Sequence, residues 1–396
     1  MANDRILIVT CVFPPEPVVS AQIAFSLAEE FVNKNIEFTV IKPAPSRPFG
    51  FVFKEEQEKS YNFKVVQLNS FVYPQKGIVG RISESISFGI ATFRYIRKHS
   101  NTFEKIYMNT WPLFSQFSVA IAARIYKKPY VIHIQDIYPE SFLNKLPKIV
   151  RPFFSLLLMP IERYVLRNAE KVIAISELMK IHLNKTRKIQ CNKISVIENW
   201  QDDFPFKEFQ TIWVNGPITF MYLGNIGPLS GLDFVIEAYA KAQLVNSRFI
   251  IAGSGSKKQD YMQLVSKLNV TSIDFMDVPS GQVPLVQSQS HILVLPIAKD
   301  SGNTSIPSKL SAYMFSSRPI LAITPLESDI YKIIEESNAG WVTTPDNIEN
   351  LIQLFNDISI LDFIEIRHKG KQALHCAEKK FAKEKNLKEL FKLIVY

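Results

Sequence analysis

A polar loop and the helix after it, within residues 301–323, hold the side chains best suited to bind an anion. The loop supplies neutral contacts through Asn303, Thr304 and Ser305, and Lys309 falls in the first turn of the predicted helix. A cation in that turn meets the positive end of the helix dipole, at a cost of roughly 0.3–1 kcal/mol. An anion held by the Lys309 ammonium and by backbone N–H groups would remove that cost. The alternative is that Lys309 extends into solvent.

Two glycine-containing turns follow predicted strands in the same half of the chain. The first, in YLGNIG, contains Gly224, Asn225 and Gly227, and the second, in IIAGSG, contains Gly253. Glycine allows a phosphate to approach the backbone closely, but any tight strand-to-helix turn also uses it, so both explanations stay open. The chain lacks G-x-x-x-x-G-K-[ST], and G-x-G-x-x-G is missing after its first strand. Neither a P-loop ATPase nor a dinucleotide oxidoreductase is therefore supported.

Two carboxylates follow the predicted strand PYVIHI. Asp136 and Glu140 lie at its carboxyl end, where one or both could orient a sugar hydroxyl or act as a general base. The alternative for Asp136 is a helix N-cap. His133 lies within the strand itself, and we interpret it as structural. The proline-rich first loop contains Glu16 and Ser20, and Glu16 is expected to face the cleft.

Apolar strands alternate with helices along the chain, which is typical of parallel sheets covered on both faces. The alternation breaks in a turn-rich linker at about residues 199–217. We therefore predict an α/β protein with two doubly wound, Rossmann-like domains, 1–205 and 206–379, and helices after about residue 380 that pack back on the first domain. Ligands of such sheets bind beyond the carboxyl ends of the strands. A site is accordingly expected where the two domains face each other across a cleft.

The net charge of +9 is concentrated in one segment. Ser141–Lys193 contains eleven Lys or Arg residues against three acids, together with the apolar run FFSLLLM. Such a segment can lie on an anionic membrane surface, at about 1 kcal/mol per cation close to it. The alternative is a solvated helix face over a core. Nucleic acid is not an expected partner, because the charge is local and no binding motif accompanies it.

Cysteine usage and hydropathy indicate a reduced, cytoplasmic protein. Cys11, Cys191 and Cys376 are widely spaced and form no disulfide or metal-binding pattern. The N-terminal MANDRILIVTCVF is interpreted as a first strand rather than a signal peptide. No apolar run approaches the roughly 18 residues of a membrane-spanning helix. We expect a protein that is soluble or peripheral at the inner face of the cytoplasmic membrane.

Taken in order, the elements QDIYPES, GNIG, IPSK and RPIL resemble the retaining nucleotide-sugar glycosyltransferases of family 4, which have the GT-B fold. The resemblance runs from about residue 5 to 360. It is strongest to the bacterial surface-polysaccharide branch that includes the N-acetyl-L-fucosamine transferases of O-antigen assembly. It implies that the second domain holds a nucleotide sugar. The first domain would receive the acceptor, often a polyprenyl-diphosphate-linked saccharide at the inner membrane face.

The resemblance further implies a metal-independent transfer, with retention, of a UDP-linked sugar that is N-acetylated or deoxy. No cofactor and no protein nucleophile are expected, and the product would serve polysaccharide, O-antigen or lipopolysaccharide biosynthesis. Asp136 and Glu140 are the catalytic candidates, and Glu16 and Ser20 of the first loop are the candidates that face the acceptor. The candidate donor-binding residues are Gly224, Asn225, Gly227, Gly253, Asp277, Asn303, Thr304, Ser305 and Lys309.

The chain departs from the family pattern at charged positions. Asn225 and Ser230 stand where an Arg and a Lys usually grip the diphosphate, and Ala312 stands near the usual ribose-binding glutamate. Lys309 is the obvious replacement cation. Two alternatives stay open. A non-hydrolysing sugar-nucleotide epimerase would place several carboxylates and a His around the sugar. A non-catalytic, membrane-surface assembly subunit would keep the fold without the charged residues.

Overall fold

The computed structural model of the chain describes residues 5–47, 61–73, 77–109, 112–144, 146–297 and 306–396. The chain divides into two compact units. Unit 1 comprises Met1–Asn199 and Glu384–Tyr396, and unit 2 comprises Trp200–Lys383. The division falls a few residues before the expected boundary at 205/206.

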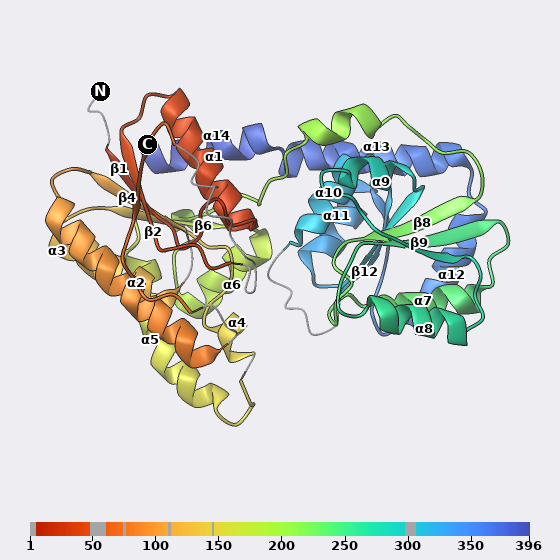
Figure 1. Ribbon diagram of the computed structural model, residues 1–396, viewed down its shortest axis with the longest axis horizontal. Helices are drawn as coiled ribbons and strands as arrows, with labels where there is room; N and C mark the ends of the chain where they lie inside the picture. The colour runs from red at the N-terminus through yellow and green to blue at the C-terminus, as the bar shows by residue number, and fades with distance from the viewer. Residues whose placement is uncertain (1–4, 48–60, 74–76, 110–111, 145, 298–305) are drawn as a thin grey trace. The chain divides into compact units, whose positions relative to one another are not determined.

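Unit 1 is built on a seven-stranded sheet with the order β3-β2-β1-β4-β5-β6-β7 (Figure 1). All of its paired strands are parallel. The strands are β1 (Ile6–Val9), β2 (Phe38–Lys42), β3 (Lys64–Gln67), β4 (Lys105–Asn109), β5 (Tyr130–His133), β6 (Lys171–Ala174) and β7 (Ile194–Val196). The helices are α1 (Val19–Asn33), α2 (Ile78–His99), α3 (Leu113–Ile125), α4 (Glu140–Leu143), α5 (Arg151–Asn168), α6 (Glu177–Arg187) and α14 (Lys383–Val395), with a 3-10 turn at Cys191–Lys193.

Unit 2 is built on a six-stranded parallel sheet with the order β10-β9-β8-β11-β12-β13. Its strands are β8 (Ile218–Leu223), β9 (Ser247–Ala252), β10 (Ile273–Met276), β11 (Ile292–Pro296), β12 (Ile320–Ile323) and β13 (Gly340–Thr343). Its helices are α7 (Leu232–Ala242), α8 (Lys258–Lys267), α9 (Val283–Ser288), α10 (Ser308–Phe315), α11 (Asp329–Ser337), α12 (Ile348–Ser359) and α13 (Phe363–Lys380), with a 3-10 turn at Phe204–Phe209.

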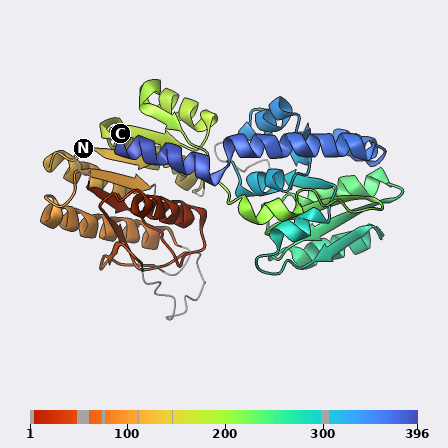
Figure 2. The ribbon, with the colours of Figure 1, turned by 90° about the horizontal axis from the view of Figure 1, so that it is seen from above.

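Helices cover both faces of each sheet, as Figure 2 shows for each unit viewed from above. The central strands are apolar throughout because both of their faces are buried; every residue of β1, β8 and β12 is inaccessible or nearly so. The prediction of two doubly wound, parallel-sheet domains is confirmed.

The C-terminal helix α14 packs on unit 1, beside α1 (Figures 1 and 2). The ring of Phe391 meets that of Phe31 with the centroids 5.6 Å apart. The side-chain amide of Asn386, which is 2% exposed, donates to the carbonyl oxygen of Glu198 at 2.9 Å. Apolar burial and a satisfied buried amide together fix the end of the chain to the first sheet.

Helix α2 buries small residues as well as large ones against the rest of unit 1. Its buried face includes Ser85 and Gly89, and a Cβ on Gly89 would lie 3.0 Å from the carbonyl oxygen of Phe114 on α3. The two helices therefore approach each other closely. As a consequence Ile86 and Ile90 are 43% and 46% exposed.

Candidate functional site

In unit 2, the turns after β8 and β9 lie against each other at the carboxyl edge of the sheet. The Gly224 N–H donates to the carbonyl of Ala252, and the Ile226 N–H donates to that of Ser254. A Cβ on Gly253, whose φ is 131°, would lie 2.1 Å from the carbonyl oxygen of Gly224. Only glycine allows this contact between two backbones.

Lys309, in the first turn of α10, turns back over the end of β8 instead of extending into solvent. Its ammonium donates to the Tyr222 hydroxyl at 2.5 Å and lies 4.4 Å from the centre of that ring. The Tyr222 hydroxyl in turn donates to the carbonyl of Asn225 at 2.6 Å. A Cβ on Gly224 would lie 2.3 Å from Cε of Lys309. The missing side chain at Gly224 therefore makes room for the lysine.

The charge on Lys309 is balanced by no carboxylate among the described residues. Burial alone lowers the pKa of its ammonium to about 8. The hydrogen bond and the cation–π contact with Tyr222 offset part of the free-energy cost of desolvating the ammonium. A partly buried cation at the N-terminus of a helix, without a carboxylate partner in the described part of the chain, is suited to bind an anion.

Tyr313 is the residue that fixes α10 to the end of β8. Its hydroxyl accepts from the Leu223 N–H and donates to the Leu223 carbonyl, both at 2.8 Å. Tyr313 is fully buried. In the sequence, Leu310, Tyr313 and Met314 fall on one apolar face of the helix. That pattern indicates core packing only, so it does not predict this positioning role.

The remaining predicted donor-binding residues make fewer contacts with the Lys309 region. The side chain of Asn225 is exposed. A Cβ on Gly227 would lie 3.0 Å from the Asn225 amide nitrogen, so this turn too is compact. The exposed Asp277 accepts from Lys258 at 2.7 Å. The predictions for Asn303, Thr304 and Ser305 fall outside the described residues.

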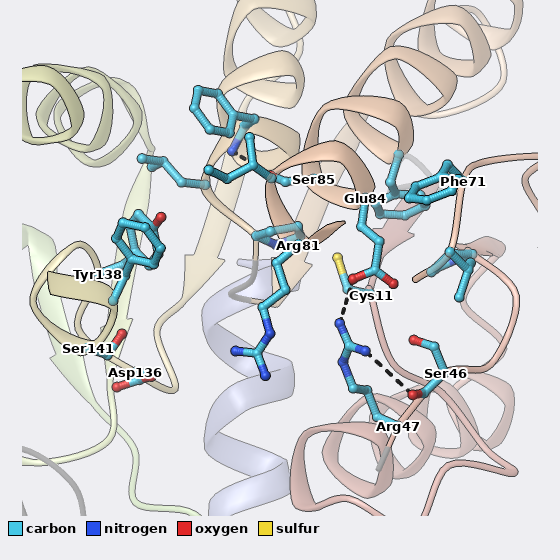
Figure 3. A pocket seen from close by; sticks show the side chains of 18 residues that line it. Cys11, Ser46, Arg47, Phe71, Arg81, Glu84, Ser85, Asp136, Tyr138 and Ser141 are labelled. Carbon is cyan, nitrogen blue, oxygen red and sulfur yellow. Dashed lines mark hydrogen bonds and ion pairs between the residues drawn. The ribbon is translucent and has the colours of Figure 1, made fainter. Parts of the chain in front are cut away.

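Unit 1 contains a cavity of about 210 Å³ at the carboxyl edge of its own sheet (Figure 3). It lies between the loops after β2 and β3, the first turns of α2 and α3, and the segment from β5 to α4. Its polar lining residues are Ser46, Arg47, Arg81, Glu84, Ser85, Asp136, Tyr138 and Ser141. Acidic, basic and aromatic groups thus meet in one hollow, which is the composition of a site for a polar ligand.

An ion pair holds one wall of this cavity. The Arg47 guanidinium donates to Glu84 at 2.7 Å, and the two side chains are 9% and 12% exposed. Glu84 also accepts from the Tyr73 N–H at 2.8 Å. Glu84 therefore ties the loops after β2 and β3 to α2.

Asp136 lies on the opposite side of the cavity from Arg47 and is exposed (Figure 3). It is not the N-cap of the following helix, because that position is Pro139. The contact of Asp136 with a substrate hydroxyl therefore stays a prediction.

Glu140, the second predicted catalytic carboxylate, belongs to an ion-pair cluster. It accepts from Arg187 at 2.6 Å and contacts the His182 ring at 3.0 Å. Burial alone would raise the pKa of Glu140, but the hydrogen bonds from His182 and Arg187 outweigh it and lower the pKa to about 2. Arg187, which is fully buried, also donates to Glu162 at 2.5 Å. A carboxylate with such a low pKa is a poor base. We therefore interpret Glu140 as a structural residue.

The first loop departs from expectation in a similar way. Glu16 was predicted to face an acceptor, but it is 2% exposed. Its carboxylate accepts the backbone N–H groups of Phe13, Ser46 and Arg47, at 2.8 to 3.0 Å. Burial raises its pKa and these hydrogen bonds oppose the rise. Glu16 therefore joins the loops after β1 and β2.

Hydrogen bonds hold two further predicted residues, Ser20 and His133, in place. Ser20, in the first turn of α1, is partly exposed, and its carbonyl accepts from the Asn109 side chain at 3.1 Å. His133 is fully buried between Tyr107 and Gln135, at 3.0 and 2.9 Å, as its structural interpretation requires.

The basic segment Ser141–Lys193 contains a compact apolar patch at the start of α5, formed by Ile149, Phe153, Leu156 and Leu157. These side chains are between 54% and 89% exposed. The spacing of Phe153, Leu156 and Leu157 places them on one face of α5, and Ile149 lies in the turn just before it. Arg187 of the same segment is buried and cannot reach a lipid surface. In the described part of the chain no helix is long and apolar enough to cross a membrane.

Both units match known protein families. Residues 20–203 match Glycosyltransferase Family 4, and residues 217–358 match Glycosyl transferases group 1. The probable glycosyltransferase WbjE of Pseudomonas aeruginosa is 23% identical over 253 residues. That match covers 59% of this chain and 60% of the length of WbjE.

Solved structures of glycosyltransferases have the same fold over the whole chain. HepE of Anabaena in complex with UDP superposes with a TM-score of 0.71 and 16% identity, covering 98% of this chain and 99% of HepE. The lipopolysaccharide outer core galactosyltransferase WaaB superposes with a TM-score of 0.68 and 14% identity, covering 98% of each chain. At these identities the likeness establishes the GT-B fold.

Proposed function

We propose that this chain, a glycosyltransferase with a family 4 domain followed by a group 1 domain, transfers a sugar from a UDP-linked donor to a lipid-linked saccharide in surface-polysaccharide assembly. The observation that carries the donor half is the position of Lys309 over Gly224. A phosphate beside that ammonium would also face the turns after β8 and β9. Structures of HepE with UDP and with UDP-glucose support a UDP donor on this fold.

Lys309 would act on the leaving group. Breaking the bond between the sugar and the diphosphate builds negative charge on the departing oxygen. A preorganised ammonium stabilises that charge more than the ground state, by about 2.7–4 kcal/mol in comparable electrostatic sites. With a pKa of about 8, Lys309 is mostly protonated at pH 7. No metal is needed in this proposal.

Asp136 would meet the acceptor. It is the carboxylate of the unit 1 cavity that lies apart from the Arg47–Glu84 pair. We propose that it orients the attacking hydroxyl, while a donor phosphate oxygen takes the proton on the side from which the leaving group departs. Attack from that side gives retention without a covalent sugar–enzyme intermediate.

The donor sugar is proposed to be N-acetylated or deoxy, and the pathway to be O-antigen or related polysaccharide synthesis. WbjE offers support only as a probable glycosyltransferase. Binding to an anionic membrane is proposed through the α5 apolar patch, with Lys148 exposed beside it. That position would bring a peripheral enzyme to a lipid-linked acceptor.

The epimerase alternative loses its main support. It needs several carboxylates and a His around one sugar, but Glu16 and Glu140 hold structural contacts and His133 is fully buried. The non-catalytic alternative requires a failed donor site, which the test below addresses.

The test is transfer of radiolabelled sugar from a panel of UDP-sugars to a short polyprenyl-diphosphate-linked saccharide. Wild-type protein should label the acceptor with one or a few donors, and Lys309→Met should reduce the rate about 100-fold or more. Lys332→Met, an exposed lysine on α11, is the control and should retain the rate. Epimerised donor without transfer would favour the epimerase, and no turnover together with no UDP binding would favour the non-catalytic subunit.

A further inference from the structure

A second cavity of unit 1, the lateral pocket, lies between α1 and the segment that leads into β3 and has a volume of about 480 Å³. Phe25, Glu29, Val32 and Asn33 of α1 line it, together with residues 61–63. Asn33 ends α1 and Phe63 directly precedes β3, so the pocket reaches the amino ends of the strands. The cavity of Figure 3 lies at the carboxyl ends and shares no described lining residue with it. The two sites are therefore distinct.

Three aromatic rings form the floor of the lateral pocket. Phe25, Tyr61 and Phe63 are each partly exposed, and their ring centroids are 5.2 to 6.4 Å apart. Phe13, which is fully buried, meets all three rings edge-on with centroids 5.5 to 6.4 Å away. The Tyr61 hydroxyl donates to the carbonyl of Pro14 at 2.9 Å. Packing from below and this hydrogen bond hold the rings in place, with part of their surface open to a ligand.

Three polar side chains stand at the rim of the lateral pocket. Glu29, Asn33 and Asn62 are exposed, and within the described part of the chain none of these side chains has a hydrogen bond or an ion pair. Two amides and a carboxylate offer both donors and acceptors to a ligand. Glu29 is also the one described lining residue with a formal charge at neutral pH. A phosphate or a nucleotide is therefore not the expected ligand, because like charges repel.

An aromatic floor with a polar, mostly uncharged rim matches the surface of a sugar. A pyranose ring presents C–H groups on its faces and hydroxyl groups around its edge. The C–H groups, which are slightly positive, suit the negative face of an aromatic ring, and the hydroxyls suit amides and a carboxylate. The volume of about 480 Å³ lies within the roughly 300–1,000 Å³ that small ligands occupy. An organic cation would also suit the rings and Glu29, but it would leave the two amides without a role.

We propose that the lateral pocket is a non-catalytic saccharide-binding site, which stacks a neutral pyranose unit on its aromatic floor and binds the hydroxyls through Asn33, Asn62 and Glu29. The inference goes beyond the transfer reaction, because none of these residues takes part in the proposed donor or acceptor chemistry. Under the proposed function, a saccharide held here would stay close to the enzyme between transfers. Its effective concentration at the catalytic edge would then rise without any new contact there.

The test titrates the full chain with three probes: cellobiose, glycerol and choline. Saturation-transfer NMR should show cellobiose binding at least fivefold more tightly than either of the others, with the strongest transfer to its ring C–H protons. Asn33→Ala combined with Asn62→Ala should weaken the affinity for cellobiose at least fivefold. The matched control, Gln190→Ala combined with Asn192→Ala, removes two exposed amides from the turn between α6 and β7 and should bind cellobiose like wild type. Glu29→Ala should weaken binding at least twofold.

Thermal unfolding and UDP titration of the same variants complete the test. All the substituted side chains are exposed, so the variants should unfold at the temperature of the wild type and bind UDP equally well. The proposal would be overturned by equal cellobiose affinity in the wild type and the Asn33, Asn62 double variant, or by no cellobiose binding at all. Tighter binding of choline than of cellobiose would overturn it in favour of an organic cation. If UDP fails to bind while cellobiose binding still depends on Asn33 and Asn62, the proposed function fails and the saccharide site stands.

Discussion

The Lys309 ammonium donates to the Tyr222 hydroxyl at 2.5 Å and lies 4.4 Å from the centre of the Tyr222 ring. This contact joins the first turn of α10 to the end of β8, through two residues that are 87 positions apart in the chain. Tyr313 reinforces the junction from the buried side of α10 through two hydrogen bonds to Leu223. These contacts hold a cation at the carboxyl edge of the unit 2 sheet.

UDP affinity should depend on pH through Lys309. Burial lowers its pKa from the ordinary 10.5 to about 8, and a bound diphosphate would favour the protonated form. Affinity should consequently be steady near pH 7 and fall by up to tenfold per pH unit above 8. Titration calorimetry from pH 6.5 to 9.5 measures this. Lys309→Met should remove the decline above pH 8, and an identical decline in that variant would show that another group is responsible.

The two glycines of the β8 and β9 turns should respond differently to alanine. In Gly224→Ala the added Cβ meets the flexible end of Lys309, so UDP affinity should fall, and the φ of 157° strains the alanine, so some stability should be lost as well. In Gly253→Ala it meets the backbone of Gly224 at a φ of 131°, which should cost unit 2 about 1–3 kcal/mol or more. Thermal unfolding and UDP titration of both variants check this contrast. It would be refuted if Gly224→Ala bound UDP like wild type.

The buried ion-pair cluster of unit 1 should be essential for stability. Arg187→Met leaves Glu162 buried and Glu140 without its main partner, at an expected cost of about 3–5 kcal/mol. Lys185→Met, an exposed position on the same helix, is the control and should cost less than about 0.5 kcal/mol. Urea unfolding measures both values.

Within this cluster, Glu140 contributes its own dependence of stability on pH. Because the folded-state pKa of Glu140 is depressed to about 2 from 4.5, its stabilisation is present above about pH 4.5 and is lost as the pH falls through 2. Arg187→Met should weaken this dependence. Unchanged stability in Arg187→Met at neutral pH would mean that the cluster is not structural.

Membrane binding should depend on the α5 apolar patch. Phe153→Ser combined with Leu156→Ser removes two exposed apolar side chains, and should reduce co-sedimentation with vesicles of anionic phospholipid at least tenfold. The matched control combines Val245→Ser with Ile360→Ser, which are 89% and 84% exposed in unit 2. Binding should also weaken at high salt. Equal sedimentation of both double variants would exclude this patch as the membrane contact.

The parts of the fold that depend on local pattern could be predicted from the sequence. Strands buried on both faces are continuously apolar, so β1, β8 and β12 stand out. The position of Lys309 at a helix N-terminus is electrostatically unfavourable, and this identifies Lys309 as a candidate anion-binding residue. In the structure it has no carboxylate partner among the described residues. Such local signals identify elements and single candidates.

Side-chain contacts between distant segments could not be predicted in the same way. Glu140 and Arg187 are 47 residues apart, and Arg47 and Glu84 are 37 apart. No local pattern pairs them, so the sequence suggests a base at Glu140 and gives no sign of the ion pair between Arg47 and Glu84 in the unit 1 cavity. Helix α2 gives a further example, since the close approach of Gly89 to α3 leaves Ile86 and Ile90 exposed.

The account depends most directly on Lys309 being the cation that binds the donor's diphosphate. Calorimetric titration of UDP at pH 7 into wild type, Lys309→Met and Lys332→Met tests this. Loss of one charge-assisted contact, about 1.5–3 kcal/mol, predicts affinity lower by roughly 10- to 150-fold in Lys309→Met and unchanged affinity in Lys332→Met. Equal UDP affinity in all three proteins would contradict the account.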